Sequence, residues 1–377
     1  MKLSKIFIVL FILHFCSSCQ TEKERAIQSE SISTVKHAIG FDIQYFNGFK
    51  KVIIKSPYPE AKKQFEYFLI PKDQEIPLQL IGSKIIKTPV NKIVVTSTTH
   101  IPMLELLEEE GSLVGFPNLK YISSEKTRKL IESSAIKELG NEQNINTEVL
   151  IDLEPEVVIG FSMSSNNKMF SNIEKSGIPV LLNGDWLEET PLGRAEWLKF
   201  FAVLFDKEKE ADSIFRNIEK QYNEAISIAK SAKSKPTILS GVLFNDFWNL
   251  PAGESFVAQF LKDANTDYLW SETKGKGSLS LNFESVFEIG QHAEFWLAPG
   301  HYNNLEQLES SNQHYTNFKS FQSNNVYSFS IKKGINGGAL YYELAPAQPH
   351  VVLMDIIKIT HPELLTDYKP FFLEQLN

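Results

Sequence analysis

Residues 146–160 have the sequence Asn-Thr-Glu-Val-Leu-Ile-Asp-Leu-Glu-Pro-Glu-Val-Val-Ile-Gly, and this stretch decides the fold class. Asn146 is a favourable N-cap, so the pattern predicts a short helix over residues 147–153. The apolar run after Pro155 predicts a buried strand over residues 157–160. A helix followed at once by a fully apolar strand is typical of an α/β fold, in which helices cover the faces of a parallel sheet.

The same alternation continues on both sides of this stretch. A polar loop at 96–100 follows a predicted strand at 92–95. More strands and helices of the first unit are expected at 103–110 (helix), 113–115 (strand), 169–175 (helix) and 179–182 (strand). After Pro236 the pattern restarts, with strands expected at 237–243, 294–297 and 325–329 and helices at 256–264, 284–289 and 351–359. The sequence therefore predicts two α/β units.

A long helix is predicted between the two units. Residues 191–233 are expected to be helical, with Asp206 as an N-cap within them. Apolar residues then recur at helical spacing, namely Ala211, Ile214, Phe215, Ile218, Tyr222, Ala225, Ile226 and Ala229. The helix is expected to run for about 26 residues, or ~39 Å. Because one apolar stripe extends along so long a helix, we expect it to lie along both units and to join them.

The first residues have the features of an export signal. Lys2 and Lys5 precede an apolar run at 6–15. That run of about ten residues is too short to span a membrane, which needs ~20, and is typical of a secretory signal. Ser17 and Ser18 precede Cys19, which resembles a bacterial lipoprotein signal that is cut before a cysteine that becomes acylated. We expect residues 1–18 to be the signal peptide, Cys19 to carry the lipid, and residues 19–36 to be a flexible tether.

A β-rich segment precedes the α/β units. Strand patterns at 41–46 and 51–54 flank the turn signal Asn47-Gly48, which predicts a hairpin, and a further strand is expected at 65–70. Residues 37–90 are therefore expected to form a β appendage. The later boundaries are 91–190 for the N-terminal lobe, 191–235 for the helical segment, 236–345 for the C-terminal lobe and 346–377 for a last helix and tail. The predicted fold is α/β, with two Rossmann-like lobes bridged by a single long helix and an N-terminal β-hairpin appendage.

Composition excludes several classes of protein. The chain has 377 residues, is 42% hydrophobic and carries a net charge of −8. Such a chain is not disordered as a whole, and its acidic balance argues against binding nucleic acid, which requires a concentrated basic patch. Cys16 and Cys19 are its two cysteines. The sequence after Cys19 therefore holds no disulfide, no cysteine-ligated zinc and no catalytic thiol.

An internal repeat relates the two units at an offset of 136 residues. Residues 145–153 and 281–289 both read apolar–Asn–x–Glu, followed by an acid four residues after the Glu and then by an apolar residue. Each copy predicts an Asn-capped helix with a Glu in its first turn, where the helix dipole favours negative charge. Two equivalent carboxylates, Glu148 and Glu284, could dock a two-fold partner that carries arginines.

Four segments together resemble the Fe³⁺-siderophore and vitamin B12 binding proteins of ABC importers. They are Val-Asn-Lys-Ile-Val-Val-Thr-Ser-Thr-Thr-His at 90–100, Leu-Val-Gly at 113–115, the stretch 146–160, and Gly-Ile-Pro-Val at 177–180. The likeness extends over residues 90–365, and residues 37–90, 191–197 and 361–365 resemble a version of the family found in Bacteroidetes. The resemblance implies a class III periplasmic binding protein, monomeric and without covalent catalysis, with its ligand in the cleft between the lobes.

The same resemblance implies the partners and the compartment. One Glu in each lobe of such proteins meets arginines of the membrane permease, and by position these are Glu148 and Glu284. The implied partners are an ABC permease dimer with its ATPase subunits and a metal chelate. The implied location is the periplasm of a Gram-negative cell, lipid-anchored to the membrane. Glu22, Lys23 and Glu24 also resemble the surface-export tags of Bacteroidetes lipoproteins, which leaves display on the outer surface open.

Ligands of α/β sheets bind beyond the carboxyl ends of the strands, which predicts the residues that line the cleft. In the N-terminal lobe and the helical segment, the candidates are Thr99, His100, Phe116, Asn183, Trp186 and Arg194. In the C-terminal lobe they are Phe244, Trp248, His301, Tyr341 and Tyr342. Aromatic faces with polar tips suit bulky planar chelates. The predicted ligand is a ferric siderophore, with a corrinoid such as cobalamin as a close second, and no covalent cofactor or resident metal is expected.

Arg194 has two interpretations. Its guanidinium could bind the carboxylates of an anionic siderophore, or it could form a structural ion pair with Glu188 or Glu196. Some siderophore binders place an arginine just before the Asn-x-Glu helix of the first lobe, whereas residues 140–143 here are Gly-Asn-Glu-Gln. That departure leaves a neutral corrinoid open.

Two other functions compete with the capture of a chelate. A binding protein for a free transition metal would use His100 and His301, although no histidine lies between residues 101 and 291, so carboxylates would have to complete the site. A heme binding protein is the other form of this alternative. An α/β hydrolase would use Ser162, because Gly-Phe-Ser-Met-Ser at 160–164 follows a buried strand like a nucleophile elbow. The closing glycine of that motif is replaced by Ser164.

Overall fold

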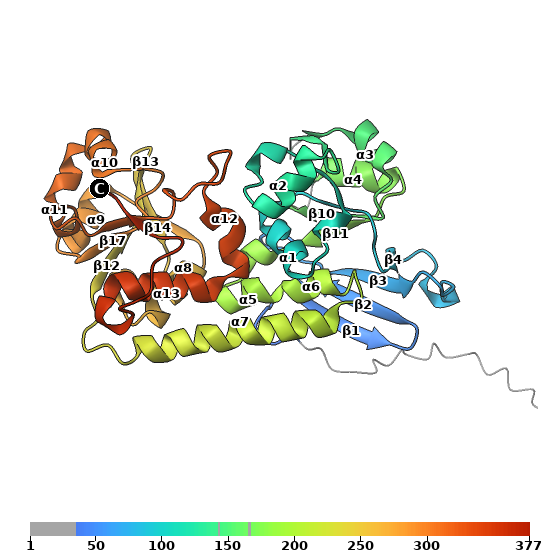
Figure 1. Cartoon of the computed structure of the whole chain (residues 1–377), viewed down its shortest axis with the longest axis horizontal. Helices are drawn as coiled ribbons and strands as arrows, with labels where there is room; N and C mark the ends of the chain where they lie inside the picture. The colour runs from blue at the N-terminus through green and yellow to red at the C-terminus, as the bar shows by residue number, and fades with distance from the viewer. Residues whose placement is uncertain (1–34, 142–143, 165–166) are drawn as a thin grey trace, which may run out of the picture.

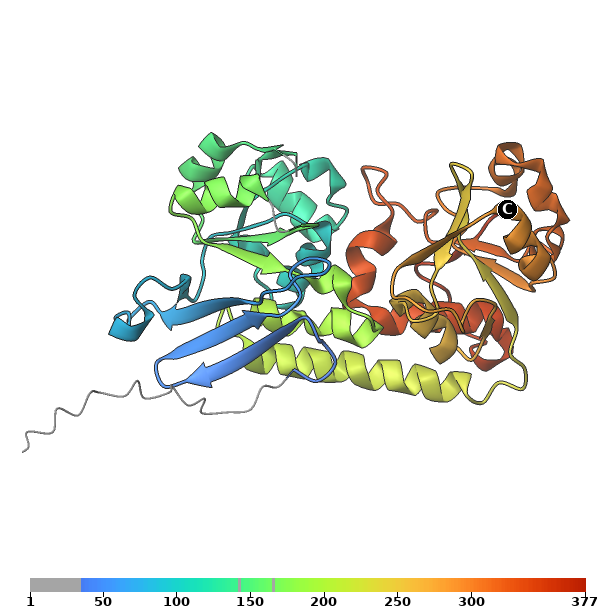
Figure 2. The ribbon, with the colours of Figure 1, turned by 180° about the vertical axis from the view of Figure 1, so that it is seen from behind.

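The computed structural model describes residues 35–141, 144–164 and 167–377. Two α/β lobes stand side by side on the long helix α7 (Glu208–Ala229), as Figures 1 and 2 show from opposite sides. Cys19 and the predicted signal and tether up to residue 34 lie outside the described residues. Within the ranges described, no helix is both long enough and apolar enough to cross a membrane.

The segment at 37–90 is a four-stranded sheet in the order β1-β2-β3-β4. The predicted hairpin is present: β1 and β2 pair antiparallel around Asn47 and Gly48, and Gly48 has the positive φ of 87° that this turn requires. Phe41, Val52 and Tyr67 of this sheet share one hydrophobic core with the N-terminal lobe, so the appendage is packed onto that lobe. Its strands are β1 (Phe41–Phe46), β2 (Phe49–Ile54), β3 (Phe65–Pro71) and β4 (Ile85–Thr88).

The N-terminal lobe is built on a five-stranded sheet with the order β11-β10-β5-β6-β7, all of it parallel. The parallel pairing, with β5 fully buried and β10 buried from Val157 to Gly160, confirms the α/β class predicted from residues 146–160. The strands are β5 (Ile93–Val95), β6 (Leu113–Phe116), β7 (Lys137–Glu138), β10 (Val157–Phe161) and β11 (Val180–Asn183), with a small pair formed by β8 (Gly140–Asn141) and β9 (Asn144–Ile145). The helices are α1 (Ile101–Leu106), α2 (Glu125–Glu132), α3 (Thr147–Leu153) and α4 (Lys168–Lys175).

The connection between the lobes comprises α5 (Pro191–Glu196), α6 (Leu198–Ala202) and α7. The apolar stripe of α7 serves both lobes, because Ala211 lies in the core of the N-terminal lobe and Phe215 in that of the C-terminal lobe. α7 has 22 residues, shorter than expected. The prediction of Asp206 as its N-cap is wrong: Asp206 has φ 57°, and its carboxylate lies 2.7 Å from Lys50 Nζ.

The C-terminal lobe repeats the α/β arrangement with a sheet in the order β15-β12-β17-β18-β19. The strand expected at 237–243 is broken at Gly241, whose φ is 78° and where a Cβ would lie 1.9 Å from the carbonyl oxygen of Asn249. The chain there leaves the main sheet for a second one. The main-sheet strands are β12 (Thr237–Ser240), β15 (Asp267–Tyr268), β17 (Phe295–Leu297), β18 (Val326–Ser328) and β19 (Glu374–Gln375), and the second sheet holds β13 (Val242–Phe244), β14 (Phe247–Pro251) and β16 (Ser278–Leu281).

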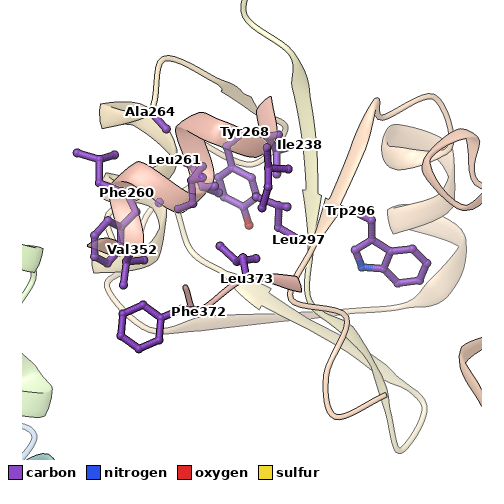
Figure 3. Close-up of a cluster of buried hydrophobic side chains, with 14 of the residues drawn as sticks. Ile238, Phe260, Leu261, Ala264, Tyr268, Trp296, Leu297, Val352, Phe372 and Leu373 are labelled. Carbon is purple, nitrogen blue, oxygen red and sulfur yellow. The ribbon is translucent and has the colours of Figure 1, made fainter. Parts of the chain in front are cut away.

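Helices cover the main sheet of this lobe. Figure 3 shows Phe260 and Leu261 of α8 and Val352 of α13 converging near Ile238 and Leu297 of the sheet. In both overall views α12 lies between the two lobes (Figures 1 and 2). The helices are α8 (Phe256–Asp263), α9 (Phe283–Gly290), α10 (Leu305–Ser311), α11 (Lys319–Gln322), α12 (Leu340–Leu344) and α13 (Pro349–Thr360).

The internal repeat is a structural equivalence. The Asn146 side chain accepts hydrogen bonds from the N–H groups of Glu148 and Val149 at the start of α3. The Asn282 side chain accepts one from Ser285 at the start of α9. Each lobe therefore presents the same Asn-capped helix.

Candidate ligand-binding site

A cavity of ≈ 440 Å³ lies between the two lobes, a volume typical of small-molecule sites, which span roughly 300–1,000 Å³. Its walls come from the loop after β5 in the N-terminal lobe, from α5, and from α8, α12 and α13 on the other side. A ligand held there would touch both lobes. The lining residues are Thr98, Thr99, Pro191, Arg194, Phe256, Phe260, Tyr341, Tyr342, Ala345, Pro346 and Pro349.

Thr98 and Thr99 form the wall from the N-terminal lobe, in a 3-10 helix at Thr98–His100 that follows β5. The Ser97 hydroxyl accepts a hydrogen bond from the Thr99 N–H and so caps this turn. The Thr99 hydroxyl donates to Asp185 Oδ2 at 3.1 Å. These threonines therefore lie at the carboxyl end of a parallel strand, where α/β folds place their ligands.

Arg194 is the one charged residue among the described residues that line the cavity. Its Nη2 donates a hydrogen bond to the carbonyl oxygen of Trp186 at 2.7 Å, and its Cζ lies 3.5 Å from the centroid of the Phe256 ring. Its Nε is buried without a hydrogen-bond partner among the described residues. Burial lowers the pKa of the guanidinium and the nearby Asp185 carboxylate raises it. An arginine nevertheless stays charged at neutral pH.

The two carboxylates that were expected to pair with Arg194 are engaged elsewhere. Glu188 accepts hydrogen bonds from the N–H groups of Ile39 and Gly40 and from the Trp197 indole. Glu196 accepts hydrogen bonds from three backbone N–H groups, at residues 36–38, and pairs with Lys199 Nζ at 2.9 Å. The ion-pair interpretation of Arg194 is therefore wrong. Within the described part of the chain, the guanidinium faces the cavity with no carboxylate in an ion pair with it.

Tyr341 and Tyr342 of α12 form the opposite wall. The Tyr341 ring stacks on Phe329, with centroids 3.8 Å apart, and meets Phe372 edge-on at 5.9 Å. Tyr342 is 53% exposed and lies 6.2 Å from the His301 ring. Tyr341 is thus a fixed aromatic wall, whereas Tyr342 stands at the rim of the cavity.

A buried carboxylate joins the lobes beside the cavity. Glu343, also on α12, is 2% exposed, and its oxygens accept hydrogen bonds from the backbone N–H groups of Ser123 (2.6 Å) and Ser124 (2.9 Å) of the N-terminal lobe. Burial raises the pKa of Glu343, and these two N–H groups partly oppose that shift. Ser124 also caps α2. The tyrosines of α12 are therefore held against the N-terminal lobe by a hydrogen-bonded contact.

Several predicted ligand residues meet at this site. Thr99, Arg194, Tyr341 and Tyr342 line the cavity. Asn183 and Trp186 do not line the cavity, and the prediction of Asn183 as a ligand contact is wrong because it is 0% exposed. The Asn183 side chain accepts a hydrogen bond from the Asp185 N–H at 2.8 Å, and the Trp186 carbonyl accepts one from Arg194. These two residues position the cavity wall.

His100 follows Thr99 but is fully buried, and its ring packs 5.3 Å from that of Phe201. Both of its ring nitrogens are buried without a hydrogen-bond partner among the described residues. Burial lowers the pKa of His100 to about 4. The imidazole is therefore neutral at physiological pH and belongs to the packing beneath the site, so its prediction as a ligand contact is wrong.

Two aromatic predictions are wrong because the side chains are core residues. Phe116 is 0% exposed and packs in the core of the N-terminal lobe. Trp248 is also 0% exposed, and its indole N–H donates to the carbonyl oxygen of Ser240 at 3.0 Å. Phe244 and His301 are exposed but do not line the cavity. Phe244 is 67% exposed near the tip of the β13–β14 hairpin.

Sequence reasoning missed the apolar part of the wall. Phe256 and Phe260 of α8 line the cavity, together with Pro191, Pro346 and Pro349. The helical spacing of Phe256 and Phe260 identifies one apolar face, but a core face and a cavity face have the same periodicity. Ser255 caps α8, but a cap indicates where a helix begins and not what its side chains contact.

Glu148 and Glu284 occupy equivalent places. Each lies in the first turn of its Asn-capped helix, α3 or α9, and each is exposed. Figure 1 shows one of these helices in each lobe. The two carboxylates are therefore available for contact with a partner.

Two observations concern the alternative functions, the binding of a free metal ion and hydrolysis by Ser162. Among the described residues, no group of three or more His, Cys, Asp or Glu side chains is placed to hold a metal ion. Ser162 is 3% exposed, and its hydroxyl donates to the carbonyl oxygen of Ser164 at 2.7 Å. A nucleophile elbow would instead hold the serine out toward substrate.

Comparison with known proteins agrees with this architecture. Over 98% of its length the chain is 25% identical to an uncharacterized lipoprotein of Methanocaldococcus jannaschii, of which it covers 95%. Among solved structures, a possible iron-binding (periplasmic solute-binding) protein of Staphylococcus epidermidis aligns with a TM-score of 0.57 at 13% identity, over 73% of this chain and 100% of that one.

The periplasmic heme binding protein of Vibrio cholerae aligns with a TM-score of 0.55 at 17% identity, over 70% of this chain and 99% of that one. The sequence pattern of the periplasmic binding proteins matches residues 93–330. That match leaves the β1–β4 sheet outside it and overturns the hydrolase alternative. The chain thus belongs to the periplasmic binding protein family, whose members bind solutes for ABC importers and are not enzymes.

Proposed function

We propose that the protein captures an anionic metal chelate between its lobes and delivers it to an ABC permease. The observation that carries this proposal is the Arg194 guanidinium: the other described residues that line the cavity are uncharged, and no described carboxylate forms an ion pair with it. A charged group in such surroundings favours a ligand that brings the opposite charge.

The rest of the lining supports a chelate over a bare cation. Thr98 and Thr99 offer hydroxyls, and Tyr341 and Phe256 offer aromatic faces. Among the described residues, none that lines the cavity is a carboxylate, a histidine or a cysteine. Aromatic walls with a few polar groups suit a large organic ligand, and the guanidinium suits carboxylates or other oxyanions at its edge. A ferric siderophore combines these properties best.

A corrinoid and heme stay as alternatives. Both have the planar apolar face that Tyr341 and Phe256 would contact, and heme also carries carboxylates for Arg194. A corrinoid with its nucleotide arm is larger than the cavity of ≈ 440 Å³ accommodates, so the lobes would have to separate to admit it. The identity of the ligand is therefore the part of the proposal that experiment must decide.

The equivalent positions of Glu148 and Glu284 support a role in docking. Each is the exposed acid at the start of an Asn-capped helix, one in each lobe. Two arginines related by the two-fold axis of a permease dimer could pair with them. We also infer that the protein works as a monomer, with Cys19 acylated and residues 19–36 as its tether, on the periplasmic face of a membrane or displayed at the outer surface.

A fluorescence titration tests the ligand. Trp186 is half-buried beside the cavity and its carbonyl holds Arg194, so ligand binding should quench its emission. Ferric siderophores, cyanocobalamin and heme are titrated in parallel, with a Trp186→Phe variant to assign the signal. Saturable quenching by one chelate at one site supports the proposal. Quenching by none of them, with binding of a bare metal ion instead, would overturn it.

A further inference from the structure

The connection between β3 and β4 carries exposed apolar side chains. Ile76, Leu78 and Ile81, which we call the apolar knob, are 42%, 83% and 69% exposed. Figures 1 and 2 show this connection projecting from the end of the N-terminal lobe that is remote from the C-terminal lobe. Large apolar side chains gathered on one projecting turn mark a contact surface, whereas single exposed ones are ordinary.

The turn that carries the knob is packed against the sheet. Leu80, within the 3-10 helix Leu78–Leu80, is 3% exposed and packs with Phe49 and Ile70 of the sheet. Its N–H donates to the carbonyl oxygen of Pro77 at 2.8 Å, and the Ser83 N–H donates to that of Leu80 at 3.0 Å. Leu80 thus fixes the turn to the sheet, while the three side chains of the knob point outward.

The knob takes no part in the ligand site. None of its side chains lines the cavity, and it lies outside residues 93–330, which match the binding-protein family. Its role is therefore separate from the capture of a chelate.

Two exposed acids, Asp73 and Glu75, precede the knob, whereas the lysines near it are engaged with other groups. Lys72 pairs with Glu156 at 2.6 Å and Lys84 with Glu174 at 2.5 Å. The Lys87 ammonium donates to the carbonyl oxygens of Pro71 and Gln74. From Ile76 to Ser83 the sequence holds no charged residue. Such a surface suits the boundary between lipid headgroups and acyl chains better than a charged protein face.

The chain before the described part brings a membrane within reach. Fifteen residues, 20–34, separate Cys19 from Val35, and the connection spans at most about 55 Å when extended. The relative from Methanocaldococcus jannaschii, which aligns over 98% of this chain, is a lipoprotein. A tether of this kind holds a protein near the bilayer but leaves its orientation free, and a second apolar contact would remove that freedom.

We propose that Ile76, Leu78 and Ile81 insert into the surface of the membrane that carries the lipid anchor and so hold the two lobes in a fixed orientation. This inference rests on the proposed acylation of Cys19. Because the described lysines near the tip, Lys72, Lys84 and Lys87, are engaged with other groups, the contact does not require anionic lipids and should persist at high salt.

The test uses the full acylated chain in vesicles of zwitterionic phosphatidylcholine. No cysteine follows Cys19, so Leu78→Cys can be labelled with an environment-sensitive fluorophore. Ile335→Cys, at a side chain that is 78% exposed on the loop before α12, is the matched control. We expect lipid-borne quenchers to reduce the emission at position 78 at least twofold and to leave position 335 unchanged, at low and at high salt.

A second variant guards against an effect of the label. With the fluorophore on Ile76→Cys, the double change Leu78→Asp and Ile81→Asp should abolish quenching while the protein still floats with the vesicles. If the protein floats and position 78 is quenched no more than position 335, the membrane contact is wrong. Quenching at 78 that appears only with a permease present would also overturn it, in favour of a protein partner. Failure of all labelled chains to float would overturn the lipid anchor and this inference together.

Discussion

The Glu343 carboxylate accepts a hydrogen bond from the backbone N–H of Ser123 at 2.6 Å, and 220 residues of sequence separate the two. With the neighbouring bond from Ser124 it links α12 to the start of α2. The contact is close: a Cβ on Gly334, in the loop before α12, would lie 2.5 Å from Ser123 Cβ. The wall of the cavity that carries Tyr341 is therefore attached to the opposite lobe.

Removal of this carboxylate should loosen the link between the lobes. Glu343→Ala leaves two buried N–H groups without their acceptor, which typically costs about 1–3 kcal/mol. We expect a lower melting temperature and faster amide hydrogen exchange at Ser123 and Ser124. Glu306→Ala on α10, where the side chain is exposed, is the control. Unchanged exchange at both serines would show that the two hydrogen bonds do not hold the lobes.

Buried His100 should make stability depend on pH. Its pKa of about 4 in the folded protein lies below its ordinary value of 6.5, so the unfolded chain binds the proton more readily. The neutral His100 imidazole therefore adds to the free energy of unfolding above pH 6.5, and this contribution is lost as the pH falls toward 4. The shift corresponds to roughly 3 kcal/mol at about 1.4 kcal/mol per pKa unit.

Urea denaturation at several pH values measures this effect. His100→Phe, which keeps an aromatic ring beside Phe201, should flatten the dependence between pH 7 and 4. His292→Gln, at an exposed histidine, should follow the parent protein. If the free energy of unfolding depends on pH in the same way in His100→Phe and in the parent protein, His100 is not the source of the pH dependence.

Removal of the Glu148 and Glu284 carboxylates should stop transport without changing ligand binding. Glu148→Ala with Glu284→Ala is expected to abolish uptake in cells and to leave the affinity for ligand unchanged, because neither side chain lines the cavity. The matched control is Asp152→Ala with Glu288→Ala, which removes one exposed acid from each of the same two helices. An equal loss of uptake in both double variants, or a loss of affinity in the first, would refute a docking role.

Periodicity and capping signals predicted the elements of the fold but not all of their neighbours. Ala211 and Phe215 lie one turn apart in α7. Ala211 packs in the core of the N-terminal lobe and Phe215 in that of the C-terminal lobe, as expected for one apolar stripe that extends along both lobes. Asn146 and Asn282 cap their helices because a cap depends on the next few residues only. Thr237 begins a strand as expected, but the break at Gly241 depends on its contact with Asn249.

The site was predicted less completely because cavities depend on contacts between distant segments. Arg194 and Tyr341 were found from their residue types, whereas Trp248 was misplaced because its burial depends on a second sheet that the strand pattern did not reveal. Phe256 was missed because the sequence shows that this side of the helix is apolar but not whether it packs in the core or lines a cavity. Nothing near Glu343 in the sequence indicates its bond to Ser123.

The most direct test of the account is the affinity of one captured chelate for two arginine variants, measured by isothermal titration calorimetry. Arg194→Gln removes the guanidinium that faces the cavity, and Arg216→Gln removes an exposed one on α7. We predict that Arg194→Gln weakens binding of an anionic ferric siderophore at least tenfold, which corresponds to about 1.4 kcal/mol, whereas Arg216→Gln leaves it unchanged. Equal affinity in both variants would contradict the capture of an anionic chelate at this site.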